Sequence, residues 1–322
     1  MNTFKVLSLD GGGARGYLTI LILERIEKYL QKYFNDKKPI GERFDLIVGT
    51  STGGIIAAGL AIGKSASEIR NLYEKLLEKI FQPYKKGFIK PKYNQEILKS
   101  ALKEILKNKT FQDVKTHLCL TSVDVATSKP RFFKSPYLEA FDTRSDEKLI
   151  DAVLATSAAP VFFPLVDTKY LSHLADGGLV ANNPTMIGVT DAYRITNDLN
   201  KIRLLSIGTG KMVQMPYEVE KIKECGGILS WALNSKNFQD TLKQPIIEKR
   251  MIIPLIEVLL NSQSSLINAQ ANLLLKSNFI RINPELPTAM DLDDTSKLNT
   301  LKNLATEVDK EKTMKKILNL LS

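Results

Sequence analysis

A serine stands between two glycines where an expected strand gives way to an expected helix. Gly49-Thr50-Ser51-Thr52-Gly53 follows an apolar run at residues 44–48 and precedes small residues at 55–62. This is the context of a nucleophile elbow, whose glycines permit a turn tight enough to lift the serine out of the sheet. The helix N-terminus behind such a serine favours developing negative charge. We therefore expect Ser51 to be a nucleophile; the alternative is a small-residue turn without chemistry.

A serine nucleophile requires a group that accepts its proton, and the chain offers few. The only histidines are His117, which enters an expected strand, and His173, in an expected loop three residues before Asp176. A Ser-His-Asp triad would have to use one of them. Asp176, in Asp176-Gly177-Gly178, is the other candidate, because a carboxylate within hydrogen-bond reach can accept the proton. By itself this tripeptide is also typical of a β-turn, so these residues leave the base open.

A glycine-rich turn near the N-terminus could bind negative charge. Gly11-Gly12-Gly13-Ala14-Arg15-Gly16 matches the G-x-G-x-x-G dinucleotide fingerprint between a strand and a helix. Asp10 precedes the glycines and would repel a pyrophosphate, and the next strand ends in Gly49-Thr50 instead of an acid for the ribose. The same N–H groups could stabilise the oxyanion of an acyl-transfer transition state. A turn without a ligand is the structural alternative.

Strands that alternate with helices must position these motifs. We predict strands at 4–9, 44–48, 118–125 and 202–207, and helices at 17–33, 55–62, 65–80, 94–106, 149–158 and 183–195. Ser65 and Glu68 form a capping-box pattern at the start of the third helix. Such alternation implies a mainly parallel sheet covered by helices. No linker or repeat interrupts it, so we expect a single α/β domain over residues 1–322, with a helical C-terminal portion from about residue 211.

Length and composition are those of an ordinary globular protein. The 322 residues are 43% hydrophobic and 25% charged. Two cysteines, Cys119 and Cys225, cannot form a disulfide framework, which favours a reducing compartment. No targeting segment is evident at the start, and no stretch reaches the roughly 20 apolar residues of a spanning helix. We expect a cytoplasmic protein.

The formal net charge of +10 raises the question of an anionic partner. Only 10 of the 45 basic residues are arginine, which nucleic-acid sites favour, so we expect no nucleic acid. Residues 85–115 carry nine lysines against three acids, an excess of +6, and aromatic residues interleave with lysines at 84–93. Lysines attract anionic headgroups, and aromatic rings settle in the membrane interface. This segment is therefore a hypothetical membrane-docking surface; a solvated helical face plus a loop is the alternative.

Three motifs in this order resemble the patatin-like phospholipase family, which is related to cytosolic phospholipase A2. They are Asp10-Gly11-Gly12-Gly13-Ala14-Arg15-Gly16, Gly49-Thr50-Ser51-Thr52-Gly53 and Asp176-Gly177-Gly178. Further matches lie at residues 155–160, 181–185, 281–287 and 291–295, so the likeness spans nearly the whole chain. It implies a three-layer α/β fold with a mainly parallel central sheet covered by helices, as one catalytic domain.

The resemblance also implies a chemistry, a Ser-Asp dyad. Ser51 would be the nucleophile, Asp176 the base, and the N–H groups of Gly11, Gly12 and Gly13 the oxyanion hole. The supporting residues would be Arg15, Gly16, Gly49, Gly53, Gly177 and Gly178. The expected reaction is hydrolysis of a fatty-acyl ester in a phospholipid or related glycerolipid through an acyl-enzyme, with no metal or cofactor. The enzyme would associate peripherally with a membrane when active.

Two other functions remain open. One is a soluble ester or thioester hydrolase with the same dyad, and the other is a non-catalytic module whose glycine loop binds a nucleotide or lipid. The family also includes bacterial effectors switched on by a nucleotide second messenger, and the motifs are compatible with a nucleotide activator without requiring one. Residues 226–231 could border an acyl pocket or act as a lid, although such a stretch is more typical of a core.

Overall fold

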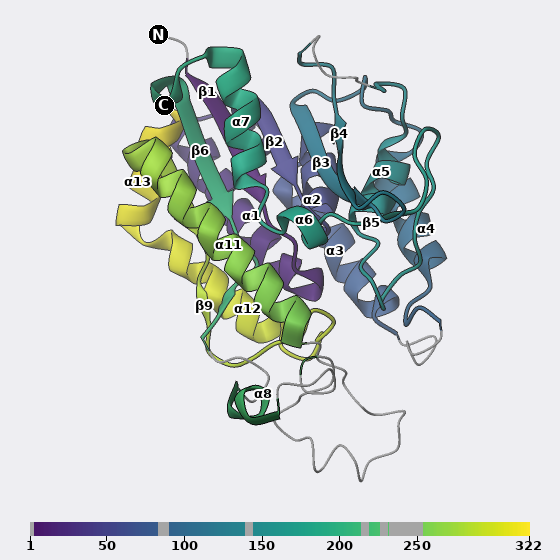
Figure 1. Ribbon diagram of the computed structural model, residues 1–322. Helices are drawn as coiled ribbons and strands as arrows, with labels where there is room; N and C mark the ends of the chain where they lie inside the picture. The colour runs from purple at the N-terminus through teal and green to yellow at the C-terminus, as the bar shows by residue number, and fades with distance from the viewer. Residues whose placement is uncertain (1–2, 83–89, 139–143, 214–218, 226–230, 232–253) are drawn as a thin grey trace.

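The computed structural model describes residues 3–82, 90–138, 144–213, 219–225, 231 and 254–322. Its central sheet runs in the order β4-β3-β2-β1-β6-β8, and β5 pairs with β3 (Figure 1). The strands are β1 (Phe4–Leu9), β2 (Leu46–Gly49), β3 (His117–Asp124), β4 (Lys129–Lys134), β5 (Leu174–Asp176), β6 (Ile202–Ile207) and β8 (Phe279–Ile282). β3, β2, β1, β6 and β8 are mutually parallel, whereas β4 and β5 run antiparallel to β3.

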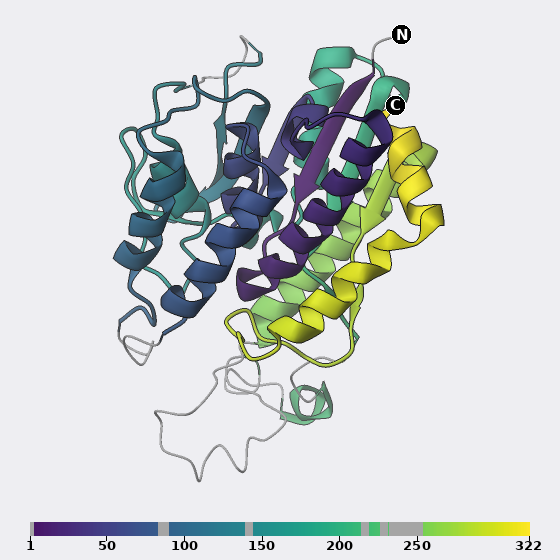
Figure 2. The same cartoon turned by 180° about the vertical axis from the view of Figure 1, so that it is seen from behind.

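Helices cover both faces of the sheet, which gives three layers (Figures 1 and 2). One face carries α7 (Thr185–Thr196) and α11 (Pro254–Leu275). The other carries α1 (Gly16–Phe34), α2 (Thr52–Ala61), α3 (Ala66–Ile80), α4 (Gln95–Leu106), α5 (Leu149–Thr156), α12 (Leu298–Ala305) and α13 (Glu311–Leu321). The one-turn helix α6 (Gly178–Ala181) follows β5, α8 (Val219–Cys225) lies apart, and β7 (Lys211–Met212) pairs with β9 (Glu285–Leu286).

The alternation of side chains along each strand builds two separate cores. Val6 and Leu204 pack with α7 and α11, whereas the adjacent Leu7 and Leu205 face the helices on the opposite side. Successive side chains of a strand point to opposite faces, so a strand covered on both sides must be apolar throughout. This is the mainly parallel, helix-covered α/β sheet that the sequence predicts.

Most predicted elements are confirmed, including the capping box, in which Ser65 accepts a hydrogen bond from the Glu68 N–H and the Glu68 side chain returns one to the Ser65 N–H. The prediction missed β4, β5 and β8. β5 has three residues and was taken as the approach to a turn, and β4 is a largely exposed edge strand rich in charge. The prediction of a helical portion after about residue 211 is wrong for β8, which extends the main sheet beside β6.

The lysine-rich segment is only partly a free basic surface. Lys85 and Lys86 lie outside the described residues. Lys92 forms an ion pair with Asp293, whose carboxylate also accepts a hydrogen bond of 2.6 Å from the hydroxyl of the buried Tyr93. Lys92 therefore has a structural partner that competes with any headgroup. Residues 226–230, considered above as a lid or a core, also lie outside the description.

No helix in the described part of the chain is both long enough and apolar enough to span a membrane.

Candidate active site

The Ser51 turn joins β2 to α2 in a conformation that few side chains adopt. Ser51 has φ 53° and ψ −124°, in the positive-φ range where a non-glycine residue is strained. A β-carbon on Gly53 would lie 2.3 Å from the Leu9 carbonyl oxygen, and one on Gly49 would lie 2.6 Å from the Gly53 carbonyl oxygen. The two glycines thus allow the backbones to approach closely enough for a nucleophile elbow, as the sequence predicted.

The strand β3 brings Asp176 to this elbow. β2 pairs with the first half of β3, where Gly49 lies opposite Leu120, and β5 pairs with the second half, where Asp176 lies opposite Ser122. Because β2 and β5 run toward each other, their last residues are two β3 residues apart, which is about 7 Å. Thr121, the β3 residue between them, hydrogen-bonds through its hydroxyl to that of Thr50 at 2.7 Å.

Asp176 is buried beside Ser51 and hydrogen-bonded to it. Its carboxylate also accepts a hydrogen bond of 2.7 Å from the Gly178 N–H. Burial raises the pKa of Asp176 to about 7, and the hydrogen bonds from Ser51 and Gly178 oppose this rise. A carboxyl group with a pKa near 7 can both accept and release a proton near neutral pH.

The glycine turn lies against the elbow but offers fewer donors than expected. A β-carbon on Gly11 would lie 3.2 Å from the Ser51 β-carbon. The Gly11 N–H, however, donates to the Asn182 carbonyl at 2.9 Å, so it is already engaged. The N–H groups of Gly12 and Gly13 have no partner among the described residues. The expectation of three oxyanion donors is therefore narrowed to Gly12 and Gly13.

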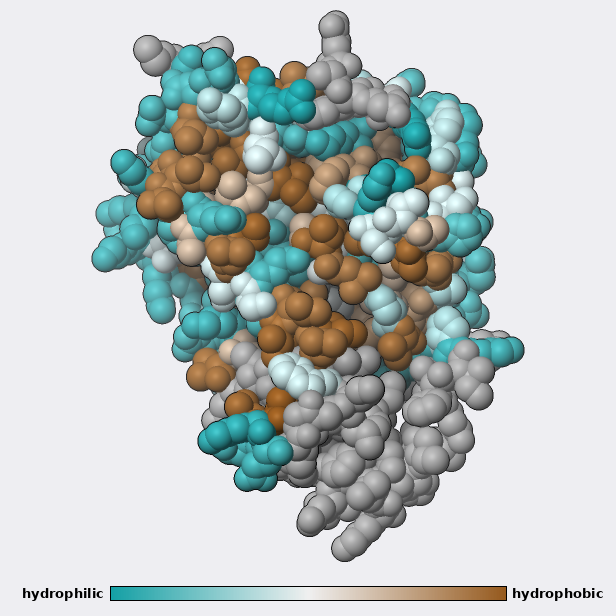
Figure 3. Space-filling view, viewed as in Figure 1, coloured by the Kyte–Doolittle hydropathy of each residue, from teal (hydrophilic) through white to brown (hydrophobic). Residues whose placement is uncertain are grey.

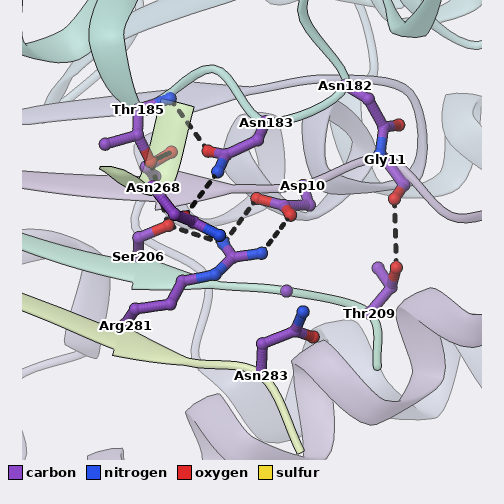
Figure 4. A network of polar contacts seen from close by, with 12 residues as sticks. Asp10, Gly11, Asn182, Asn183, Thr185, Ser206, Thr209, Asn268, Arg281 and Asn283 are labelled. Atoms are coloured by element: carbon purple, nitrogen blue, oxygen red, sulfur yellow. Dashed lines mark hydrogen bonds and ion pairs between the residues drawn. The ribbon is translucent and has the colours of Figure 1, made fainter. Parts of the chain in front are cut away.

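A buried ion pair holds the start of the glycine turn. Asp10 receives both terminal nitrogens of Arg281, from β8, at 2.8 and 2.5 Å, and Arg281 also donates to Ser206 at 2.7 Å (Figure 4). Such a two-pronged pair sets both distance and orientation. The carboxylate that would repel a pyrophosphate thus already has its cationic partner, which weakens the case for a dinucleotide site.

The C-terminal third also clamps the other end of the turn. The Ala14 N–H donates to the Leu292 carbonyl at 2.7 Å. The buried Arg15 side chain donates to the Met290 carbonyl at 3.4 Å, which fits the supporting role expected of it. Gly13, with φ 56°, approaches Leu292 so closely that a β-carbon would lie 2.1 Å from its carbonyl oxygen.

The remaining predicted supporting glycines all lie where a side chain would collide. A β-carbon on Gly16 would lie 2.2 Å from the Thr52 hydroxyl, and one on Gly177 would lie 2.0 Å from the Thr121 hydroxyl. One on Gly178 would lie 3.0 Å from an Asp176 carboxylate oxygen. These positions allow the elbow, the glycine turn and the base turn to pack together.

An apolar pocket opens beside Ser51. Besides Gly13, Ser51 and Thr52, it is lined by Ile55, Tyr73, Leu76, Leu77, Ile80, Phe81 and Phe163. The Tyr73 hydroxyl donates to the Gly13 carbonyl at 3.0 Å, so α3 joins the pocket wall to the glycine turn. Such a lining suits a hydrocarbon chain next to a nucleophile.

Neither histidine reaches Ser51. His117 pairs with Leu46 at the opposite end of β2 from the elbow, and its ring packs on Tyr137. His173 is exposed and lies three residues along an extended segment from Asp176, about 10 Å away. The structure thus brings Asp176 to Ser51 and leaves both histidines remote from it.

Several contributing residues were missed by the sequence analysis. Thr156 in α5 accepts a hydrogen bond of 3.0 Å from the Ser51 N–H, and Gln263 in α11 bonds to the segment after Asp176. Arg281 falls within a segment that resembles the family, but no role had been assigned to it. Single polar residues far away in sequence carry no local pattern, so only the tertiary contacts reveal them.

Comparison with known proteins gives the family. A model of the patatin-like phospholipases matches residues 7–189. The chain is 30% identical over 346 residues to patatin-like protein 4 of Arabidopsis thaliana, covering 94% of this chain and 82% of that one. It is 40% identical over 230 residues to a protein of Vibrio cholerae named cGAMP-activated phospholipase, and 42% identical over 220 residues to one of that name from Escherichia coli.

The chain belongs to the patatin-like phospholipase family. The matches to the two bacterial relatives cover 65% and 64% of this chain and 64% and 62% of theirs, so the chain spans less than two thirds of their length.

Proposed function

We propose that this protein is a lipid acyl hydrolase that cleaves fatty-acyl esters of phospholipids or related glycerolipids with a Ser51–Asp176 dyad. The observation that carries the proposal is the hydrogen bond between the Ser51 hydroxyl and the buried Asp176 carboxylate beside an apolar pocket. Membership of the family supports the reaction class. The pocket favours a hydrocarbon chain over the small soluble esters considered above.

In the first half-reaction, Asp176 takes the hydroxyl proton as Ser51 Oγ attacks the acyl carbonyl carbon. The carbonyl electron pair moves onto oxygen, and the N–H groups of Gly12 and Gly13 stabilise this oxyanion. When the tetrahedral intermediate collapses, the alcohol leaves with the proton from Asp176. The acyl group remains as an ester on Ser51.

In the second half-reaction, Asp176 takes a proton from water, and the resulting hydroxide attacks the acyl-enzyme. Collapse of this intermediate releases the fatty acid, and the proton returns to Ser51 Oγ. A base whose pKa lies near 7 serves both directions of transfer, because it gives up its proton as readily as it gains one near neutral pH.

Covalent labelling tests the dyad directly. A fluorophosphonate probe should modify the wild type at Ser51 and leave Ser51→Ala unlabelled. Asp176→Asn should retain its melting temperature while turnover of a mixed phospholipid substrate falls at least about 1000-fold. Full activity of Asp176→Asn would return the role of base to His173, and His173→Ala is the matched control.

We further propose that leucines beside the base turn contact the lipid surface. Apolar side chains gather over α11 and its neighbours on the face seen in Figure 3. Among them, Leu179 follows Gly178 directly, and Leu255 and Leu259 begin α11; all three are exposed. Leu260 faces Gly178, with a side-chain atom 3.6 Å from where a β-carbon would lie, which brings this end of α11 to the site.

Replacing Leu255 and Leu259 together by serine should weaken binding to phosphatidylcholine–phosphatidylglycerol vesicles about tenfold or more in sedimentation, because apolar area is lost from the contact. Leu273→Ser is the matched control. It is more exposed, but lies about 20 Å from Leu259 along the same helix. Equal effects of the two changes would refute a contact localised at the active site.

A nucleotide activator is a second element of the proposal, favoured by the names of relatives. The Vibrio cholerae and Escherichia coli proteins are named cGAMP-activated phospholipases, and another from Escherichia coli, 32% identical over 223 residues, is named a cUMP-AMP-activated phospholipase. Running the hydrolysis assay with each cyclic dinucleotide and without one tests this element. Equal rates in all arms would contradict it without touching the dyad.

We also propose that residues 1–322 act as one catalytic unit. Contacts from the C-terminal third support this, since β8 extends the main sheet and Arg281 binds Asp10 before the glycine turn.

A further inference from the structure

The side chain of Gln263 in α11 bridges two backbone groups at the end of α6. Its Oε1 accepts a hydrogen bond of 2.7 Å from the Asn182 N–H, and its Nε2 donates to the Val180 carbonyl at 2.6 Å. One backbone partner can only donate and the other can only accept, so the orientation of the amide is determined. Gln263 thus supplies both partners that the short helix lacks at its C-terminal end.

The two ends of this bridge belong to the two halves of the active site. α6 begins at Gly178, whose N–H binds the Asp176 carboxylate. Asn182, directly after α6, accepts through its carbonyl the hydrogen bond of the Gly11 N–H at 2.9 Å. Gln263 binds the N–H of the same residue. One side chain therefore ties down the segment that joins the base turn to the glycine turn.

α11 is a firm platform for this bridge because it is anchored elsewhere. Ala271 and Leu275 are buried in the core between the sheet, α7 and α11. One turn beyond Gln263, the Asn268 side chain accepts a hydrogen bond of 3.0 Å from the Asn183 amide (Figure 4). A movement of residues 178–183 away from the elbow would have to break these bonds together.

We propose that Gln263 is a positioning residue that sets where Asp176 and the oxyanion donors Gly12 and Gly13 stand relative to one another. This inference rests on the proposed dyad chemistry. The bridge touches neither the nucleophile nor the apolar pocket. It should therefore affect the transition state, in which proton transfer and oxyanion stabilisation must coincide, more than ground-state binding of lipid.

The test compares Gln263→Leu and Gln263→Glu with Gln270→Leu, a control at an exposed glutamine of the same helix. Gln263→Leu should lower kcat about 10- to 100-fold and leave KM within about twofold. Gln263→Glu keeps an acceptor for the Asn182 N–H but loses the donor to Val180. Its negative charge should also shift the acid limb of the pH–rate profile to higher pH, because like charge disfavours ionisation of Asp176.

Melting temperatures separate positioning from unfolding. The inference is supported if the Gln263 variants stay folded at the assay temperature and kcat falls while KM does not rise. It is overturned if folded Gln263→Leu keeps the kcat of Gln270→Leu, or if KM rises while kcat holds. If Gln263→Leu does not fold, the absence of both a kcat loss and a pH shift in Gln263→Glu overturns it. A wild type without Ser51-dependent hydrolysis refutes the proposed function itself, which none of these outcomes does.

Discussion

The turn that carries Ser51 and the turn that carries Asp176 meet at one point of the sheet but are held there differently. Around Ser51, Gly49 approaches the backbone of Gly53, and the Ser51 carbonyl accepts the N–H groups of residues 54 and 55. The Asp176 turn depends on distant partners: Ala158 accepts the Asp176 N–H, and Thr156 accepts the Gly177 N–H.

This difference teaches where each half is vulnerable. The elbow is maintained by close packing of backbone on backbone, which a single added methyl group disrupts. The base turn is maintained by hydrogen bonds contributed by β3, α5 and α11, each of modest net energy. Changes at the elbow should thus be severe and steric, whereas changes around the base turn should be graded.

The largest effect is expected from Gly53→Ala. Its β-carbon would lie 2.3 Å from the Leu9 carbonyl oxygen and 2.6 Å from that of Asp10, so strands β1 and β2 would have to move. We expect a loss of about 1–3 kcal/mol in urea-induced unfolding and at least a 100-fold loss of turnover. Gly59→Ala, in the same helix, is the control, because its β-carbon would meet only flexible Ile69 atoms. Equal costs would break the comparison.

The pH dependence should report the base turn alone, since the elbow contains no titrating group. Burial raises the pKa of Asp176 to about 7, and the carboxyl must be ionised to accept a proton. We expect kcat/KM to rise about tenfold per pH unit below 7 and to level off above it. The rate of fluorophosphonate labelling should follow the same limb. A flat profile between pH 5 and 8 would show that a buried Asp176 is not the base.

The smallest effect is expected from Thr121→Val, which removes the hydroxyl between the two turns while preserving shape. Its partner Thr50 retains a hydrogen bond of 2.6 Å to the Ala181 carbonyl, so the loss is partial. We expect about 1 kcal/mol less stability and a fall in kcat of only a few-fold. Thr190→Val, at an exposed threonine, is the control. A fall of 100-fold or more would place the base turn in the steric class of the elbow.

The two turns also differ in how far the sequence predicts them. β1, β2, α2 and α3 were predicted nearly to the residue, because their apolar periods, glycines and capping box are local. β5 was missed, because a three-residue strand has no period of its own and forms only where β3 offers an unpaired edge. β8 was missed for a similar reason, since its four residues acquire a strand only beside β6.

The glycine turn lies between these cases. The sequence identified it and predicted three donors, but could not show that the Gly11 N–H is engaged by Asn182, 171 residues later in the chain. Nor could it show that Arg281 neutralises Asp10. Both contacts join residues that no local pattern links, so only the assembled sheet reveals them.

The sequence by itself determined the elbow at Ser51, the order of the strands and helices around it, and the family. Glycine spacing and apolar period act over a few residues, so they can be read without coordinates. Tertiary structure decided that Asp176, not a histidine, faces Ser51, because β3 aligns the ends of β2 and β5. It also decided which glycine N–H groups are left unengaged and that Gln263 bridges the base turn to the glycine turn, because these depend on packing between distant segments.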